Sequence, residues 1–355
     1  MGQYNLREQI SQTLDIAKTL IHSNPFEAIR LADQSAERAN ILGYGTFEAE
    51  AALIKLLAYR AEASTPIDVI EGTALHTITL AQAHQQEPIW LEALNCYADI
   101  LYGMSQYDAA MDYWLQLLEV GIDRDWAQAR AQAYIGIGKL FWIFEDHQSC
   151  LEYTHKAQHE MQLVKQVPVE VKVCLLINLA AYAYHRRQNL LSHQYIDQAQ
   201  ELVLGIPFCE YEPEIYYYRA YLFRAEGKID AASDQLKRAL VLNAHSSNNW
   251  GKAVTMIGLG EINLDARRPH QALYFLNQAL DVSSSLPNPY LMMQSHELLA
   301  RCHNSLGQTD LEFQHWSKHF DLSDGLVNHV MNHRLASFKR QSLQLRVHEL
   351  ENSTA

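Results

Sequence analysis

The sequence predicts an all-α protein built from repeated pairs of helices, and three observations support this fold class. The 355 residues contain only nine prolines and fifteen glycines, which disfavours a β-rich or linker-rich chain. One helical pattern recurs about every 40 residues along most of the chain. Each copy carries small residues at fixed places, which would let the backbones of two helices approach closely. The repeated unit is therefore expected to be a helix pair.

Six segments define the second helix of each expected pair. Their first residues lie 40, 42, 40, 40 and 40 positions apart, at Tyr107, His147, Asn189, Ile229, Pro269 and Thr309. Three positions into five of them stands a small residue, and these five residues are Ala110, Cys150, Ser192, Ala232 and Ala272. The last segment breaks this pattern with Glu312. A second set follows seven positions later, at Leu117, Ala157, Ala199, Ala239, Ala279 and His319.

The first helix of each pair is marked by a small residue of its own. These residues are Ala98, Gly138, Ala180, Ala220, Gly260 and Ala300. A helix pair of this kind exposes an apolar face that only the next pair can cover, so the pairs are expected to stack in sequence. Weaker copies are expected nearer the N-terminus, in "PFEAIRLADQSAERA", which begins with Pro25, and in "FEAEAALIKLLAYRAEA" paired with "VIEGTALHTITLAQAH". The chain would then hold about eight pairs.

The pattern resembles the tetratricopeptide repeat (TPR) family, both in its small residues and in Gly227, Gly307 and Ser105 at the turns between helices. The period of about 40 exceeds the family's period of roughly 34 residues, and the closing proline of each family repeat is mostly absent. The resemblance implies a right-handed α-solenoid over residues 1–322, with clear repeats in 91–322 and degenerate repeats in 1–86. It also implies a concave groove lined by the first helix of each pair.

Thirteen residues fall on the groove positions that the resemblance implies. They are Asp99, Tyr102, Lys139, Trp142, Asn178, Tyr184, Tyr217, Tyr221, Arg224, Glu261, Asp265, Glu297 and Arg301. Tyrosine, tryptophan and arginine are frequent binding anchors, so the groove is expected to take a peptide, a protein or a small molecule. In "EIYYYRAYLFRAEG" the residues Tyr217, Tyr221 and Arg224 form one stripe, and Tyr216 and Phe223 are expected on an opposite, buried stripe. The alternative is that the two stripe tyrosines only pack between neighbouring helices.

Residues 323–355 are expected to form a separate helical segment after the last repeat. One apolar seam could cap that repeat, and it consists of Met331, Leu335 and Phe338. A second seam is expected to point away from the repeats and to form a short two-stranded coiled coil, which implies a homodimer. This second seam consists of Leu343, Val347 and Leu350. The alternative is a lone capping helix with a frayed tail.

A TPR array followed by "LRVHELENSTA" resembles the N-terminal region of bacterial GGDEF diguanylate cyclases, in which a linker helix leads into the catalytic domain. The resemblance implies a regulatory and dimerisation region that controls synthesis of cyclic di-GMP from GTP by an output domain absent from these residues. The chain itself is not expected to be an enzyme. The alternative is a free-standing TPR adaptor, or a peptide-sensing regulator that scaffolds partner proteins.

Composition and missing motifs narrow the function further. A net charge of −13 disfavours binding to nucleic acid, because an acidic surface repels phosphates. The absence of a secretory signal and of any apolar run of roughly eighteen residues predicts a cytoplasmic chain off the membrane, and five cysteines without a CxxC pair indicate a reducing compartment. Histidine pairs at i, i+4 lack further ligands for a metal. No nucleotide-binding or nucleophile motif is present, so neither a cofactor nor a catalytic residue is expected.

Overall fold

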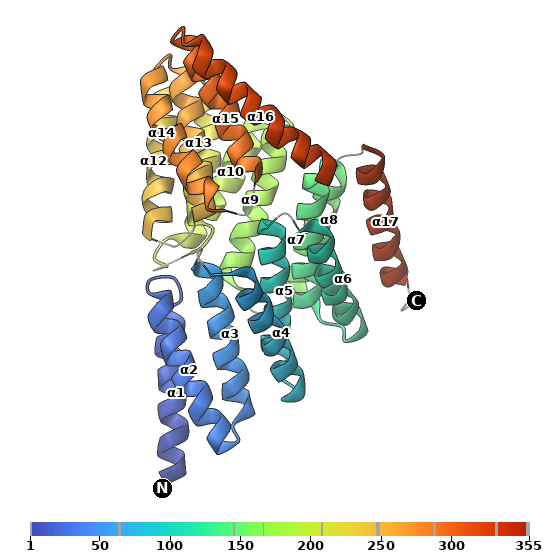
Figure 1. Cartoon of the computed structure of the whole chain (residues 1–355). Coiled ribbons are helices and arrows are strands. Elements are labelled where there is room, and N and C mark those ends of the chain that lie inside the picture. The colour runs from blue at the N-terminus through green and yellow to red at the C-terminus, as the bar shows by residue number, and fades with distance from the viewer. Residues whose placement is uncertain are drawn as a thin grey trace. The chain divides into compact units, whose positions relative to one another are not determined.

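The computed structural model of the chain describes residues 2–352 apart from 63–64, 105, 145, 166, 207–208, 246–248, 287–288 and 331–332. Within these residues, side chains are described outside 2–5, 67, 245, 324–330 and 333–339. The regular structure of the described residues consists of seventeen α-helices, and consecutive helices form antiparallel pairs (Figure 1). The chain divides into two compact units, residues 1–120 and most of residues 121–355. The predicted all-α fold is confirmed.

The first unit contains three helix pairs. They are α1 (Gly2–Leu20) with α2 (Pro25–Leu42), α3 (Gly45–Ala61) with α4 (Ile67–Ala83), and α5 (Glu87–Gly103) with α6 (Tyr107–Asp123). Leu14, Ala28 and Ile54, one from each of the first three helices, meet in a common apolar core. The indole Nε1 of Trp114 on α6 donates a hydrogen bond to Asn95 Oδ1 on α5 at 3.3 Å. Each helix therefore buries one side against the next helices along the chain.

The second unit contains five helix pairs and one further helix. The pairs are α7 (Ala127–Ile143) with α8 (His147–Leu163), α9 (Val169–His185) with α10 (Asn189–Val203), α11 (Glu212–Ala225) with α12 (Ile229–His245), α13 (Asn249–Asp265) with α14 (Pro269–Ser284), and α15 (Pro289–Ser305) with α16 (Thr309–Val330). The further helix is α17 (His333–Asn352). Core clusters join consecutive pairs, and in one of them Val173, Ile196 and Ile215 meet from α9, α10 and α11. The stacking of pairs that the sequence predicts is present within this unit.

The predicted repeat pattern coincides with the helices. All six predicted starts are the first residues of α6, α8, α10, α12, α14 and α16. The small residues of the pattern are buried where the two helices of a pair meet, and Ala110, Ala180 and Ala272 have no exposed surface. The weaker copies are also present, because α2 begins at Pro25, and α3 and α4 occupy the second predicted pair. Eight helix pairs are thus found in the described residues, as expected.

Four of the turns between the two helices of a pair contain a residue in the left-handed conformation. Gly227 and Gly307 take φ angles of 75° and 70°, and Arg187 and Arg267 take 58° and 56° at the equivalent positions. Glycine adopts this conformation without a steric cost, whereas a residue with a Cβ does so at some expense. The glycines predicted at these turns are confirmed, and the two arginines show that the turn geometry is kept even without glycine. Ser105, predicted for the same role, lies outside the described residues.

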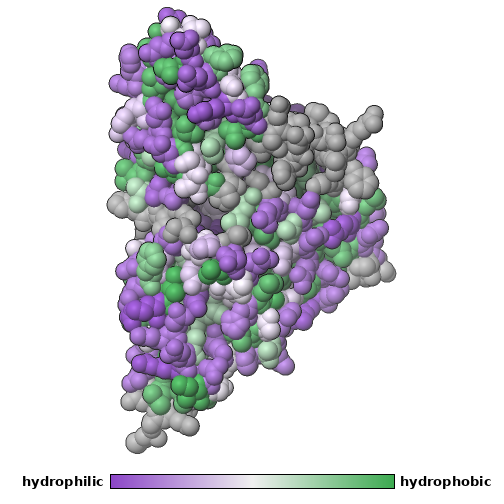
Figure 2. All heavy atoms as spheres, viewed as in Figure 1, coloured by the Kyte–Doolittle hydropathy of each residue, from purple (hydrophilic) through white to green (hydrophobic). Residues whose placement is uncertain are grey.

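Three features of the described residues bear on the kind of functional site to expect. Hydrophilic side chains cover much of the face shown in Figure 2, with small hydrophobic groups between them. In the described part of the chain, no helix combines the length and the apolar character needed to cross a membrane. The same residues hold no group of three or more metal-ligating side chains arranged around a common point. Polar and aromatic side chains, in contrast, form clusters on first helices of the second unit.

Candidate binding site

Six of the predicted groove residues come together on three successive first helices of the second unit. Tyr184 belongs to α9, Tyr217, Tyr221 and Arg224 belong to α11, and Glu261 and Asp265 belong to α13. The ring centroids of Tyr217 and Tyr221 are 4.8 Å apart. The ring of Tyr184 meets that of Tyr221 edge-on at 6.3 Å. We refer to these six residues as the tyrosine–carboxylate cluster.

Hydrogen bonds and ion pairs join α11 to α13 within the cluster. Tyr221 donates its hydroxyl proton to Glu261 Oε2 at 2.8 Å. Arg224 donates from Nη1 to the same Glu261 oxygen at 2.8 Å and from Nε to Asp265 Oδ2 at 2.6 Å. The partners are 37 to 41 residues apart in sequence, which is close to one repeat. Equivalent positions of consecutive repeats therefore face one another, as stacking of the pairs requires.

The cluster is half-buried and carries an excess of negative charge. The side chains of Arg224, Glu261 and Asp265 are 27%, 26% and 33% exposed. Burial raises the pKa of Tyr221 well above its ordinary value, and the neighbouring Tyr217 and the charge of Glu261 raise that pKa further. Burial acts against the charge of Arg224, but its bond to Asp265 and the charge of Glu261 outweigh this and raise the pKa of Arg224. One cation thus faces two carboxylates.

A second aromatic group lies on the preceding helices of the same unit. Trp142 on α7 was predicted as a groove residue, and its ring centroid is 4.6 Å from that of His147 on α8 and 4.7 Å from that of His185 on α9. Burial lowers the pKa of His185, and the nearby His147 lowers that pKa further. Neither histidine was predicted as a groove residue from the sequence. His185 directly follows the predicted Tyr184, but no spacing signal separates it from the other histidines of the chain.

The remaining predicted groove residues are divided between the two units. Asp99 and Tyr102 belong to the first unit, where the Tyr102 ring packs at 5.6 Å from Tyr107 and 5.8 Å from Trp114. Four others lie on first helices of the second unit, and the described contacts do not connect them to the cluster. They are Lys139, which is half-buried, Asn178 and Glu297, which are also half-buried, and Arg301, which is exposed. The ring contacts, hydrogen bonds and ion pairs described here between predicted groove residues thus lie on α9, α11 and α13.

The two stripes predicted for α11 are less distinct than expected. Tyr216 and Phe223 were expected to be buried, yet both are only half-buried. Tyr217, expected on the groove stripe, packs with Phe223 against the core cluster that contains Ala220, Leu236 and Leu259. The expectation of a buried opposite stripe is therefore met only in part, because residues of both stripes pack against the core cluster of α11, α12 and α13. Tyr217 serves packing as well as the cluster.

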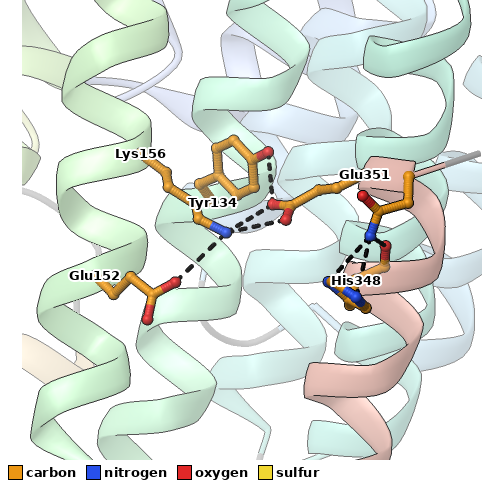
Figure 3. Close-up of polar contacts among 6 residues, drawn as sticks. Tyr134, Glu152, Lys156, His348 and Glu351 are labelled. Atoms are coloured by element: carbon orange, nitrogen blue, oxygen red, sulfur yellow. Dashed lines mark hydrogen bonds and ion pairs between the residues drawn. The ribbon is translucent and has the colours of Figure 1, made fainter. Parts of the chain in front are cut away.

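The apolar seam of α17 does not point away from the repeats. Leu343 and Val347 are 0% exposed within the single chain, and Leu350 is half-buried. Figure 3 shows the polar contacts that accompany this burial, with Glu351 of α17 facing Tyr134 of α7 and Lys156 of α8. The predicted direction of the seam is wrong, because the same spacing that suits a coiled coil also fits the surface of a neighbouring helix pair. The earlier seam of Met331, Leu335 and Phe338 falls outside the described side chains.

The contacts of α17 extend along α8. Near the start of α8, Arg340 Nε lies 3.8 Å from Asp146 Oδ2, and Gln344 donates to Ser149 Oγ at 3.2 Å. Further along, Lys156 Nζ contacts the two carboxylate oxygens of Glu351 at 2.8 and 3.1 Å. An open groove of about 590 Å³ adjoins this end of α17 and is lined by residues of α7, α8 and Glu351. This hollow is separate from the tyrosine–carboxylate cluster.

Comparisons with known proteins show the fold of the chain. No family model matches the sequence. No curated protein matches it either. The crystal structure of a Rap protein complexed with competence and sporulation factor matches with 12% identity and a TM-score of 0.54 over 97% of this chain and 99% of that chain. The crystal structure of the APC/C hetero-tetramer Cut9–Hcn1 matches with 16% identity and a TM-score of 0.60 over 94% of this chain and 55% of that chain. At these identities the likeness is one of fold, and the chain has an all-α, TPR-like solenoid fold.

Proposed function

We propose that the chain is a non-catalytic scaffold that binds a peptide or a segment of another protein at the tyrosine–carboxylate cluster. The observation that carries this proposal is the convergence of six polar and aromatic residues from α9, α11 and α13, five of them half-buried and Asp265 exposed. Such a surface offers both ring faces and charged groups to a ligand that crosses several helices. The matched Rap structure is a complex with competence and sporulation factor, and the matched Cut9–Hcn1 structure is a hetero-tetramer. Both are consistent with a fold used for binding.

The charges of the cluster indicate the chemistry of the ligand. Glu261 and Asp265 together exceed the single positive charge of Arg224, so the cluster attracts a cation. Arg224 already lies over the ring of Tyr221 at 5.7 Å, so a ligand would meet the exposed parts of the half-buried Tyr184 and Tyr217 rings. We therefore expect a segment that carries a lysine or an arginine next to an apolar side chain. An acidic segment would be repelled.

A matched pair of variants tests this proposal. Peptides selected from a random display library against the full chain would be measured by fluorescence anisotropy against Asp265→Asn and Asp281→Asn. Both variants remove one carboxylate from the second unit, but Asp281 is an exposed residue of α14 outside the cluster. We expect about tenfold weaker binding to Asp265→Asn, which corresponds to a loss of about 1.4 kcal/mol in binding free energy. Binding to Asp281→Asn should be unchanged. Equal affinities for both variants, or selection of acidic peptides, would contradict the proposal.

The narrower function suggested by the sequence stays a prediction. Regulation of a GGDEF diguanylate cyclase rests on the resemblance of "LRVHELENSTA" to the linker of that family. The burial of Leu343 and Val347 bears on this prediction, because these side chains would have to leave their present contacts to form a coiled coil with a second chain. A coding sequence that continues beyond residue 355 into DxLTGLxNR and GGDEF motifs would support the cyclase. A continuation without them would contradict it.

A further inference from the structure

The surface on which α17 rests has the properties of a binding site for a helix. It is formed by Tyr134 of α7 and by the side of α8 that runs from Asp146 to Lys156. We propose that this surface binds an amphipathic helix of a partner protein, and that α17 is the occupant supplied by the chain itself, which such a partner displaces. The proposal goes beyond the peptide-binding function above, because none of these residues belongs to the tyrosine–carboxylate cluster.

The apolar part of the contact is small and specific. Leu343 and Val347 are four residues apart, so they project from the same side of α17, and both are fully buried. Other positions of α17 face solvent, including Leu345, which is 60% exposed. Two buried apolar side chains leave α17 weakly held, since a short helix must also be ordered when it docks. A helix with the same two residues can therefore compete for the surface.

The polar part of the contact recognises a carboxylate. Lys156 Nζ holds both oxygens of Glu351, and Tyr134 donates its hydroxyl proton to Oε1 of the same group at 3.0 Å (Figure 3). Lys156 is itself positioned over the rings of Tyr153 and Tyr134, at 4.8 and 5.7 Å from their centroids. The lysine and the phenol thus form a receptor that is largely built by α7 and α8. A charge-assisted bond to two donors in one place distinguishes an acidic residue from a neutral one.

The order of the contacts sets the direction of the bound helix. Arg340, Gln344 and Glu351 of α17 meet Asp146, which caps the N-terminus of α8, and Ser149 and Lys156 of α8, so that residue numbers rise together along both helices. The bound helix therefore runs parallel to α8, with its basic residue near the acidic start of α8 and its acidic residue near Lys156. The partner helix should carry a base, two apolar residues and an acid with the spacing of Arg340, Leu343, Val347 and Glu351. A reversed helix would place like charges together.

Binding of a labelled peptide to the full chain tests the proposal. The peptide has the sequence of residues 336–352, and its affinity is measured by fluorescence anisotropy for the wild-type chain and for the Leu343→Asp, Val347→Asp double variant. The double variant releases its own α17, so we expect it to bind the peptide at least tenfold more tightly than the wild-type chain. A peptide with Glu351→Lys should bind the double variant at least tenfold more weakly. A peptide with Glu349→Lys carries the same charge change at an exposed position and should bind normally.

Several outcomes would overturn the proposal. Equal affinity of both chains for the peptide would show that α17 does not occupy the site, and equal weakening by the two lysine substitutions would show that Glu351 is not recognised. A dimer of the wild-type chain that the double variant converts to a monomer would assign the surface to a second copy instead of a partner protein. If the double variant does not fold, hydrogen exchange of the wild-type chain replaces it. We then expect Lys156→Glu to accelerate exchange of residues 341–352 at least tenfold and Glu351→Lys to reverse this, whereas no acceleration would refute the contact.

Discussion

The crossing of α13 and α14 in the second unit gives a sharp test of how the repeats pack. Gly260 on α13 faces Leu276 on α14, and a Cβ added at Gly260 would lie 2.4 Å from Leu276 Cδ2 and 2.5 Å from Leu276 Cγ. Carbon atoms pack at about 3.5–4.0 Å, so Gly260→Ala requires Leu276 or the backbone to move. Leu276 is 0% exposed and packs in the core cluster of α13, α14 and α15. Its branched end has no free space to retreat into without disturbing that cluster.

Two opposing effects set the magnitude. Replacing a glycine inside a helix by alanine favours the folded state by about 0.5–1 kcal/mol. Inserting a methyl group into a packed core costs about 1–3 kcal/mol. The overpacking is the larger effect at 2.4 Å, so we expect Gly260→Ala to lower the free energy of unfolding by about 1–2 kcal/mol. The opposite sign is expected for Gly138→Ala.

Gly138 is the matched control because it occupies the equivalent repeat position in α7. A Cβ there would meet Cys150 O at 3.5 Å and Tyr153 Cβ at 3.8 Å, which are ordinary contacts. Gly138→Ala should therefore raise the stability by about 0.5–1 kcal/mol through helix propensity alone. Urea unfolding followed by circular dichroism would compare both variants, and hydrogen exchange of α13 and α14 would locate the effect, since repeat arrays need not unfold in one step. If Gly260→Ala were as stable as Gly138→Ala, the reasoning from this crossing would be refuted.

Three further predictions follow from individual contacts. Tyr221→Phe removes the hydroxyl that donates to Glu261 and should cost about 1 kcal/mol in urea unfolding, whereas no loss would mean that this bond does not form in solution. Arg267→Gly relieves a left-handed residue at φ 56° and should add about 1 kcal/mol, which Arg268→Gly at the next position should not. His296 has a pKa lowered to about 4 by burial and by its neighbours His315 and Lys318. Because the unfolded chain takes up this proton near the ordinary histidine pKa of about 6.5, stability should fall by at most about 3 kcal/mol as the pH drops from about 6.5 to about 4. Thermal melts should show a flatter pH dependence for His296→Gln. An unchanged pH dependence in this variant would contradict the assignment to His296.

The helix pairs could be predicted from the sequence because the two helices cross in the same way in every repeat. A small residue at a helix crossing is required by the approach of two backbones, so Ala110, Ala180 and Ala272 each carry the same information. The turns between the helices were harder to predict from the sequence. Gly227 and Gly307 mark their turns, but Arg187 and Arg267 adopt the same left-handed conformation without a signal in the residue type. Their turns follow from the repeat period instead.

The tyrosine–carboxylate cluster could be predicted only in part. The repeat alignment placed Tyr184, Tyr221 and Glu261 on successive first helices, and stacking of equivalent positions brings them together. The alignment gave no pairing, because a hydroxyl proton and a carboxylate form a bond only when two helices stand at a particular distance and rotation. This distance depends on the whole packed interface. The engagement of Arg224 by two carboxylates is therefore a property of the fold that spacing along one helix does not contain.

The position of α17 could not be predicted for a related reason. The spacing of Leu343 and Val347 predicts that one side of the helix is buried, but it does not identify the surface that buries it. A second helix in a coiled coil and the surface of α8 would both fit this spacing. The deciding contact is between Lys156 and Glu351, which are 195 residues apart in sequence and belong to no shared pattern. Because the same two apolar side chains cannot be buried in both places, docking on α8 and pairing with a second chain exclude each other. Any partner that takes the α8 surface thus releases α17, and the occupancy of that surface determines whether the seam of α17 is free to bind elsewhere.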